Sequence, residues 1–214
     1  MARNKYPEQT IKKILDTSLR LFSEKGYEQT TIQDIVHDLG MSKGAIYHHF
    51  KSKEEILLAL GNHYYNDHAM FGNIKERDDL TGLEKIREIF VLQLSNQSKA
   101  DMDVLTINIW KDPKFFMMDM KNNLTENPLA IMGMLEEGMA DGSIRKQDAK
   151  CLAQVVLMLV NYWVLSPITG FSPEDLKTKI HYLRYFTDAI GLPVINDHVE
   201  QLAFEYFDRL AKAV

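Results

Sequence analysis

The segment from Thr30 to Lys53 constrains the fold most, because it contains two short helical patterns joined by a tight turn. Thr30 and Gln33 have the spacing of a capping box, and apolar residues then recur with helical period. This pattern predicts a first helix from about Thr31 to Leu39. Its apolar face consists of Ile32, Ile35, Val36 and Leu39.

A second helix is predicted directly after the first. Gly40 suits the left-handed backbone that ends many helices, and Ser42 suits the N-cap of the helix that follows. In the second helix, Lys43–His49, only Ile46 is core-directed, together with Phe50 just beyond it. Two short helices joined by a turn of three or four residues form a helix-turn-helix.

The front of the second helix has an unusual composition. Gly44 and Ala45 leave it bare, so its backbone can approach the major groove of double-stranded DNA closely. Long donors beside them suit phosphates and base edges. The alternative is that the aromatic residues form an ordinary solvated face. The donors are Lys43, Tyr47, His48 and His49.

Helices are also predicted on either side of this motif. Ser52 and Glu55 form a capping box at the start of a long helix with an apolar stripe of its own. Upstream, Pro7 suits the first turn of a helix that ends near Gly26. The two stripes are Ile56, Leu57, Leu60 and Tyr64, and Ile11, Ile14, Leu15, Leu19 and Phe22.

Several short motifs in the first quarter of the chain resemble the DNA-binding domain of the TetR/AcrR family of bacterial transcriptional regulators. The chain departs from the family at Val36 and His37, where many members have an alanine and another small or charged residue. The matching motifs are FSEKG from Phe22, Tyr27, Thr30-Thr31-Ile32, Asp34-Ile35, Gly40, and SKGAIYHHFKSK from Ser42 to Lys53.

The resemblance implies an all-α chain with a helix-turn-helix domain over residues 1–53. A long helix would join it to an all-helical domain over 54–214 that dimerises and binds a small effector, which releases the DNA. The expected function is that of a sequence-specific DNA-binding regulator, in most cases a repressor. Thr30, Thr31, Ser42, Tyr47, His49 and Lys53 match phosphate-contacting positions, and Lys43, Gly44, Ala45 and His48 match positions that contact bases.

The distribution of charge favours the same interpretation. Residues 1–53 hold nine Lys and Arg against six Asp and Glu, a balance of +3, while the remainder holds sixteen against twenty-four, a balance of −8. A basic N-terminal region on an acidic body concentrates favourable potential for DNA at the predicted interface. Arg3 and Lys5 add either flexible phosphate contacts or a solubilising tail.

Composition indicates a cytoplasmic protein with a core of its own. A length of 214 residues and 45% hydrophobic composition need no disulfides, and we expect the lone Cys151 to be a small core residue. The apolar stretch from Cys151 to Leu165 is shorter than the roughly 20 residues of a membrane span. It also contains Gln154 and Asn161. We expect a helix that is buried nearly all round, and no membrane partner or export.

The rest of the chain shows a series of capped helical patterns. Thr81 with Glu84 begins one helix, and Asp112-Pro113 and Asn127-Pro128 each resemble a cap followed by a first-turn proline. Pro128 equally suits a kink in one long helix. The family resemblance further implies a homodimer through the helices around 146–166 and 172–190, on a partly palindromic operator.

Methionine and aromatic residues are frequent between Met102 and Met139. Such residues line adaptable apolar pockets, although they also fill the core of any helical bundle. We expect a largely apolar effector, and the acidic body favours a neutral or cationic one. No cofactor or metal is expected. The candidate wall residues are Trp110, Phe116, Met120, Tyr162 and Trp163.

Two other functional classes are weaker. An enzyme would have to use His63, Asp67 and His68, but histidines five apart point about 140° away from each other around a helix. A protein-interaction module with a vestigial helix-turn-helix is the second alternative. It predicts no preferred DNA sequence and no dependence of binding on salt.

Overall fold

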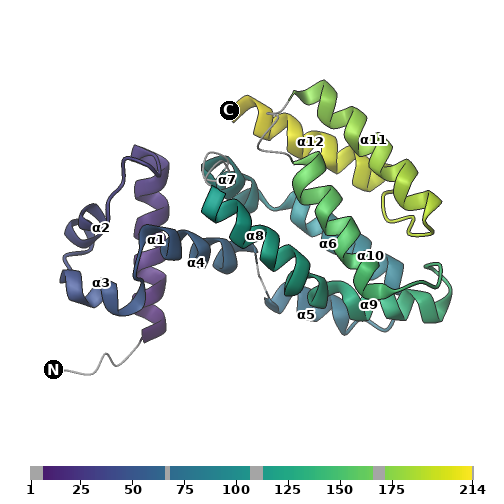
Figure 1. Cartoon of the computed structure of the whole chain (residues 1–214), viewed down its shortest axis with the longest axis horizontal. Helices are drawn as coiled ribbons and strands as arrows, with labels where there is room; N and C mark the ends of the chain where they lie inside the picture. The colour runs from purple at the N-terminus through teal and green to yellow at the C-terminus, as the bar shows by residue number, and fades with distance from the viewer. Residues whose placement is uncertain (1–6, 66–67, 107–112, 166–171, 214) are drawn as a thin grey trace. The chain divides into compact units, whose positions relative to one another are not determined.

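The computed structural model describes residues 7–65, 68–106, 113–165 and 172–213, and these residues form helices without a strand. The chain divides into two compact units, Met1–Asp67 and His68–Val214. Each unit is a separate bundle in Figure 1. The predicted all-α class is therefore confirmed.

The first unit consists of four helices. Ile14 and Phe22 of the first helix, Ile35 of the second and Ile46 of the third are buried in its core. Each such side chain contributes about 1.5–3 kcal/mol when fully buried. The helices are α1 (Pro7–Lys25), α2 (Ile32–Leu39), α3 (Lys43–His49) and α4 (Lys53–Tyr65).

Helix α4 belongs to the first unit. It packs against α1, with Ile56, Leu57 and Leu60 buried. The compact unit therefore extends past the boundary that we predict at residue 53. The described part of α4 ends at Tyr65 and the next helix begins at His68, so the continuous connecting helix expected from the sequence crosses residues 66–67, which lie outside the described part.

The second unit holds the remaining helices. Helices α6 and α9 pack together, and α6 also contacts α12, which lies beside α11 (Figure 1). In chain order they are α5 (His68–Lys75), α6 (Gly82–Ser95), α7 (Gln97–Thr106), α8 (Pro113–Thr125), α9 (Asn127–Asp141), α10 (Ala149–Met158), the π-helical η2 (Leu159–Val164), α11 (Pro173–Ala189) and α12 (Asp197–Ala213).

The contact between α6 and α9 is unusually close. A Cβ atom built on Gly82 would lie 2.1 Å from the backbone nitrogen of Gly138 and 2.3 Å from the carbonyl oxygen of Met134. Glycine at position 82 therefore lets the two backbones touch. Leu83, Ile86 and Leu135 are buried around this contact.

Most predicted helix starts are confirmed. Thr81 and Glu84 form the predicted capping box of α6, and Ser172 caps α11 by accepting a hydrogen bond from the Asp175 amide. Asn127 is instead the first residue of α9, where Glu126 precedes it without a side-chain cap. Pro128 suits this first turn, so α8 and α9 are separate helices.

The expectation that Cys151 is a core residue is wrong, because its side chain is exposed. Leu152, Ala153 and Val156 face the core, whereas Val155 on the opposite side is 44% exposed. Within one chain, α10 therefore has a solvent-facing side and is not buried nearly all round. Helical periodicity places residues 151 and 155 on the same face.

Candidate nucleic-acid interface

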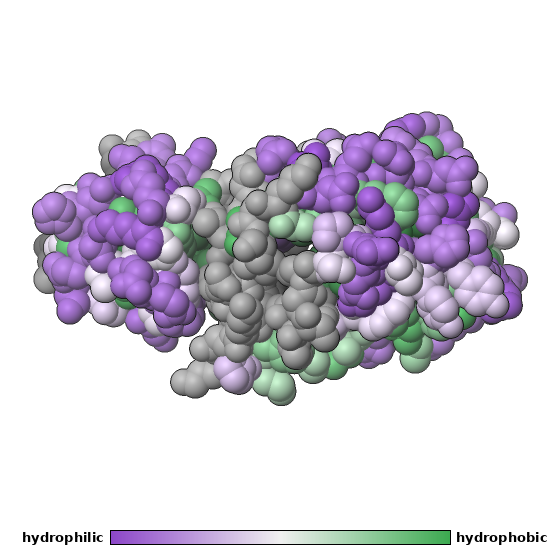
Figure 2. All heavy atoms as spheres, turned by 90° about the horizontal axis from the view of Figure 1, so that it is seen from above, coloured by the Kyte–Doolittle hydropathy of each residue, from purple (hydrophilic) through white to green (hydrophobic). Residues whose placement is uncertain are grey.

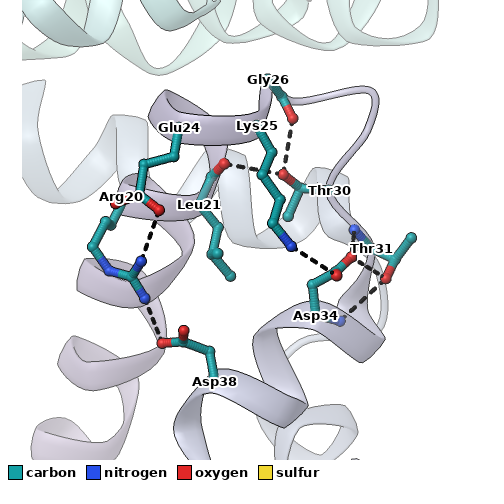
Figure 3. A network of polar contacts seen from close by, with 9 residues as sticks. All are labelled: Arg20, Leu21, Glu24, Lys25, Gly26, Thr30, Thr31, Asp34 and Asp38. Carbon is teal, nitrogen blue, oxygen red and sulfur yellow. Dashed lines mark hydrogen bonds and ion pairs between the residues drawn. The ribbon is translucent and has the colours of Figure 1, made fainter.

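Ion pairs hold α2 against the end of α1 (Figure 3). The Arg20 guanidinium lies 2.8 Å from Glu24 of its own helix and 2.5 Å from Asp38 of α2. The Lys25 ammonium lies 3.0 Å from Asp34. These pairs are largely exposed, so each contributes little alone. Together they fix the direction of α2, and thereby of the helix that follows it.

Thr31, and not Thr30, is the N-cap of α2. Its hydroxyl oxygen accepts a hydrogen bond from the Asp34 amide, and the Asp34 carboxylate accepts from the Thr31 amide at 2.8 Å. The capping box that we predict between Thr30 and Gln33 is therefore shifted by one residue. Hydrogen bonds from Thr31, with Lys25 beside them, hold the pKa of Asp34 well below its ordinary value.

Thr30 has a structural role that the sequence did not indicate. Its side chain is 1% exposed, and its hydroxyl group lies within hydrogen-bond distance of two backbone carbonyls, that of Leu21 in α1 at 3.2 Å and that of Gly26 just after α1 at 2.8 Å (Figure 3). This hydroxyl ties the loop before α2 to α1. It is not available to a phosphate in this conformation.

The turn and α3 form as predicted. Gly40 has a φ of 60°, in the left-handed region, and its amide donates to carbonyls of α2. The Ser42 hydroxyl caps α3 by accepting from the Ala45 amide at 3.2 Å. Ile46 is fully buried and Phe50 is 7% exposed, so these two side chains anchor α3 to the unit.

The opposite face of α3 is open. A Cβ atom at Gly44 would meet nothing within 4 Å. The Lys43 ammonium lies 5.6 Å from the centre of the Tyr47 ring, and the His48 and His49 rings pack edge to face at 5.2 Å. Ser42, Lys43, Gly44, Tyr47 and His48 are exposed, and Ala45 and His49 are partly buried.

Lys53 lies differently from the other predicted contacts. Its ammonium donates to the carbonyl of Tyr27 at 2.8 Å and sits 4.1 Å from the centre of the Tyr27 ring. A second carbonyl, that of Glu28, lies at 3.4 Å. Lys53 therefore stabilises the loop between α1 and α2. Ser52 caps α4 as predicted, although Glu55 accepts from the Lys51 amide and not from Ser52.

The basic side chains of the first unit differ in whether they already bind a carboxylate or a carbonyl group. Arg20 and Lys25 are paired with carboxylates, and Lys53 with carbonyls. By contrast, the exposed side chains of four other lysines form no ion pair with another described residue. These lysines are Lys12, Lys13, Lys43 and Lys51.

The predicted effector-site residues divide into separate groups. Phe116 of α8 and Tyr162 of η2 pack edge to face, with ring centres 5.4 Å apart, and Met120 is partly buried on α8. Trp163 is 37% exposed and instead contacts Tyr182 of α11, at 6.2 Å. The structure thus does not bring Trp163 together with Phe116. Trp110 lies outside the described residues.

Polar residues that sequence reasoning missed surround the Phe116–Tyr162 pair. Asp119 and Asn123 of α8 both contact the Tyr162 hydroxyl. Their spacing of four on one helix is the signal that was available from the sequence. Nothing in the sequence indicated which later segment they would meet.

The chain matches known proteins in both its sequence and its fold. Residues 14–60 match the family described as bacterial regulatory proteins, tetR family. The repressor KstR2 of Rhodococcus jostii is 30% identical over 140 residues, which cover 62% of this chain and 66% of that repressor. The chain belongs to the TetR family. The helix-turn-helix in these relatives supports the resemblance drawn from α2 and α3.

Two further relatives show how far the likeness reaches. YerO of Bacillus subtilis, an uncharacterised HTH-type transcriptional regulator, is 54% identical over 52 residues. The matched residues cover 24% of this TetR-family chain and 18% of YerO, so the match spans about a fifth of the length of YerO. Salmonella enterica GusR shares the fold, with a TM-score of 0.62, 20% identity, and 89% of this chain and 99% of GusR covered.

One solved relative contains a small molecule. A protein of Saccharomonospora viridis, described as a transcriptional regulator, was solved in complex with choline. It has a TM-score of 0.56 and 25% identity to this chain, with 84% of this chain and 96% of the other covered. The KstR2 and YerO relatives are named as transcriptional regulators or repressors and not as enzymes.

The described residues contain neither a metal-binding group nor a membrane-spanning helix. Among these residues, no group of three or more His, Cys, Asp or Glu is arranged to hold a metal ion. No helix in the described part of the chain is long and apolar enough to cross a membrane. The side chains of His63 and His68 lie outside the part that the structure describes.

Proposed function

We propose that this protein is a sequence-specific DNA-binding regulator that represses transcription and leaves its operator when a small molecule binds the second unit. The observation that carries the proposal is the open face of α3. There, Gly44 offers free space beside the exposed Lys43 and Tyr47, on a helix that Ile46 and Phe50 fix from behind. Such a helix can enter the major groove without rearrangement.

Roles differ among the predicted contact residues. Lys43 and His48 are exposed at the front of α3 and are assigned to base edges, with Gly44 and Ala45 providing clearance. Tyr47 and Thr31 are exposed and are assigned to phosphates, as are Ser42 and His49. Thr30 and Lys53 are assigned indirect roles, because their polar atoms already bind the loop between α1 and α2.

A homodimer fits the exposed residues of the second unit. Trp163 and the tyrosines Tyr182 and Tyr185 form a chain of ring contacts, and the two tyrosines are 60% and 69% exposed. In Figure 2 the first unit, on the left, is largely hydrophilic, whereas hydrophobic side chains gather along one edge of the second unit. We assign the aromatic face of η2 and α11, which is formed by Trp163, Tyr182 and Tyr185, to the dimer contact expected around 146–166 and 172–190. Two-fold symmetry would then place two α3 helices roughly 34 Å apart, one turn of DNA.

Release by an effector requires only modest coupling. A preference of about 1–3 kcal/mol for one arrangement of the two DNA-binding units changes occupancy 5- to 150-fold. The relative from Saccharomonospora viridis, solved in complex with choline, supports the binding of a small molecule. KstR2, named as a repressor, supports repression over activation.

The most informative test is selection of bound sequences from a random pool of duplex DNA with the full-length protein. We expect an enriched, partly palindromic sequence. Its affinity should fall with salt at a log–log slope near −0.9 per phosphate neutralised. A pool without enrichment, together with salt-independent binding, favours the protein-interaction module instead.

Two lysine variants test the division of roles. Lys43→Ala should relax sequence preference, because it removes a donor from the front of α3. Lys53→Ala should weaken binding to all sequences alike, because it loosens the loop that carries α2. Competition binding with matched and scrambled operators measures both effects. Equal loss of preference in the two variants contradicts the assignment.

The dimer is tested separately by measuring mass in solution. The wild-type protein should be dimeric at micromolar concentration, and the double change Tyr182→Asp with Tyr185→Asp should yield monomers that bind the operator weakly. Substitution of the exposed Lys121, which lies on α8 outside both ranges assigned to the dimer contact, serves as the control. A wild-type monomer that binds the operator tightly contradicts the dimeric proposal.

A further inference from the structure

A partly buried group of polar side chains lies between α8 and η2. The Asp119 carboxylate accepts a hydrogen bond from the Tyr162 hydroxyl at 2.5 Å and one from the Asn123 amide at 2.7 Å. The Asn123 amide nitrogen also lies 2.9 Å from the Tyr162 oxygen, and Asn161 donates to the Asn123 carbonyl oxygen at 2.7 Å. We call these four residues the Asp119 cluster.

Neutral side chains surround the Asp119 carboxylate in the described part of the structure. Its two side-chain donors, Tyr162 and Asn123, are neutral, and no ion pair joins it to a basic side chain that the structure describes. Burial raises the pKa of Asp119 above its ordinary value, outweighing the hydrogen bonds from Tyr162 and Asn123, which lower it. A buried charge without a partner is costly, so a cation placed beside it would be strongly favoured.

Helix geometry concentrates these residues on one side. Phe116, Asp119 and Asn123 are spaced by three and four, so they share one face of α8. Opposite them, the chain is π-helical from Leu159 to Val164, and the consecutive residues Asn161 and Tyr162 both contact α8. Single π-helical turns inside α-helices occur frequently at functional sites.

The aromatic rings beside the carboxylate add a second kind of recognition. The Phe116 and Tyr162 rings pack edge to face at 5.4 Å. Aromatic faces attract organic cations through the ring quadrupole, by about 0.5–2 kcal/mol depending on desolvation. A carboxylate and two rings thus combine the charge and the apolar surface that an organic ammonium group requires.

The same group remains accessible from outside. Asn123 is 2% exposed and lies at the buried end of the Asp119 cluster. Asp119, Phe116 and Tyr162 are each partly exposed. The charged and aromatic side chains of this group are therefore in contact with solvent.

We propose that the Asp119 cluster is the polar end of the effector site, and that the effector is an organic cation with an ammonium group and an apolar body. The inference rests on the proposed function, because it names the chemical class of molecule that the second unit senses. Asp119 holds the positive charge, Phe116 and Tyr162 contact the apolar groups around it, and Asn123 and Asn161 fix the acceptor geometry.

Matched pairs of cations and uncharged isosteres test the proposal on the full-length protein. The probes are choline with 3,3-dimethylbutan-1-ol, and benzyltrimethylammonium with 2,2-dimethylpropylbenzene. Calorimetric titration should show at least one cation binding about tenfold or more tightly than its isostere, equivalent to about 1.4 kcal/mol. If neither cation binds more tightly than its isostere, the proposal is overturned. This comparison uses the wild-type chain and does not depend on the folding of a variant.

Variants then locate the effect. Asp119→Asn keeps the shape of the side chain and should abolish the preference for the cation. Tyr162→Phe keeps the charge and should retain the preference. Glu126→Gln, which removes an exposed carboxylate at the end of α8, controls for nonspecific attraction. A cation preference that survives in Asp119→Asn refutes the assignment of the site.

The cation-binding test can fail independently of the operator-selection test of the proposed function. Operator selection and cation titration are independent measurements on the wild-type chain, because the operator is assigned to the first unit and the cation to the second. Failure to select any operator overturns the regulatory role while leaving the cation measurement intact. Normal operator selection without cation preference overturns only the effector class.

Discussion

The face of α3 and the Asp119 cluster are opposite solutions to presenting polar side chains. On α3 the donors are exposed, and the caps that hold the helix come from residues within three positions, such as Ser42 with Ala45. In the Asp119 cluster the polar atoms are partly buried, and Asn123 meets Tyr162, which is 39 residues away in the sequence. The role that we propose for α3 requires free space around its donors, whereas the role that we propose for the Asp119 cluster requires a partner from a distant segment.

This difference separates what local sequence can encode from what it cannot. A capping box or a glycine turn is decided by a few adjacent residues, because the hydrogen bonds that form are local. A buried contact between distant segments is decided by how whole helices pack. Substitutions that remove a local contact and substitutions that disturb a long-range contact should therefore have different effects.

The largest effect is expected from Gly82→Ala. The added methyl group would overlap the backbone of α9, which cannot rotate away, so the second unit should lose about 3 kcal/mol or more of unfolding free energy. Gly133→Ala, on α9 where a Cβ has free space, is the matched control and should be neutral or stabilising. Denaturant unfolding followed by circular dichroism measures both. Equal stability of the two variants contradicts the close packing.

Thr30→Val should destabilise the first unit by about 1–2 kcal/mol, because it removes a buried donor from the carbonyls of Leu21 and Gly26. The control is Thr125→Val, whose hydroxyl donates to a carbonyl of its own helix at the surface. Its effect should stay within about 0.5 kcal/mol. Thermal unfolding distinguishes a structural threonine from a phosphate contact, which would leave stability unchanged.

Gly44→Ala should separate folding from binding. Because nothing lies within 4 Å of the new methyl group, stability should remain or rise slightly. Operator binding should weaken roughly tenfold, or about 1.4 kcal/mol, because the methyl group keeps α3 from the groove. Fluorescence anisotropy with the selected operator gives the affinity. Unchanged affinity would mean that Gly44 does not face DNA.

The smallest effect is expected from Asp34→Asn, and it should depend on pH. The folded-state pKa of Asp34 is lowered, so its carboxylate stabilises the fold at neutral pH, and this contribution is lost as the pH falls below about 4. The variant should be less stable than the wild type at pH 7, with the difference shrinking in acid. Gln33→Ala, at the predicted but unused capping position, should show no such pH dependence.

The first unit follows closely from its sequence. The bounds of α3 and the left-handed Gly40 are as predicted, because caps and turns depend on near neighbours. The exceptions arise where a distant carbonyl competes for a side chain. Thr30 bonds to the Leu21 carbonyl of α1 and Lys53 to the Tyr27 carbonyl of the loop, so the polar groups of both side chains are engaged within the first unit.

The second unit was predictable in its helix starts and not in its site. The Thr81 and Ser172 caps are confirmed, yet Cys151 is exposed and Trp163 turns toward α11. The periodicity of a largely apolar segment leaves the orientation of its faces open, since apolar residues occur all round it. The π-helical turn at Leu159–Val164 adds a change of register that the amino-acid pattern does not mark.

By itself, the sequence determined the all-helical class, the helix-turn-helix and its exposed front, because helix periods and caps are local properties of the chain. The burial of Thr30, the contact of Gly82 with Gly138 and the hydrogen bond from Tyr162 to Asp119 emerge only in the folded chain. These contacts join residues far apart in the sequence. Their geometry is fixed by the packing of helices against one another and not by the preference of any residue for its neighbours.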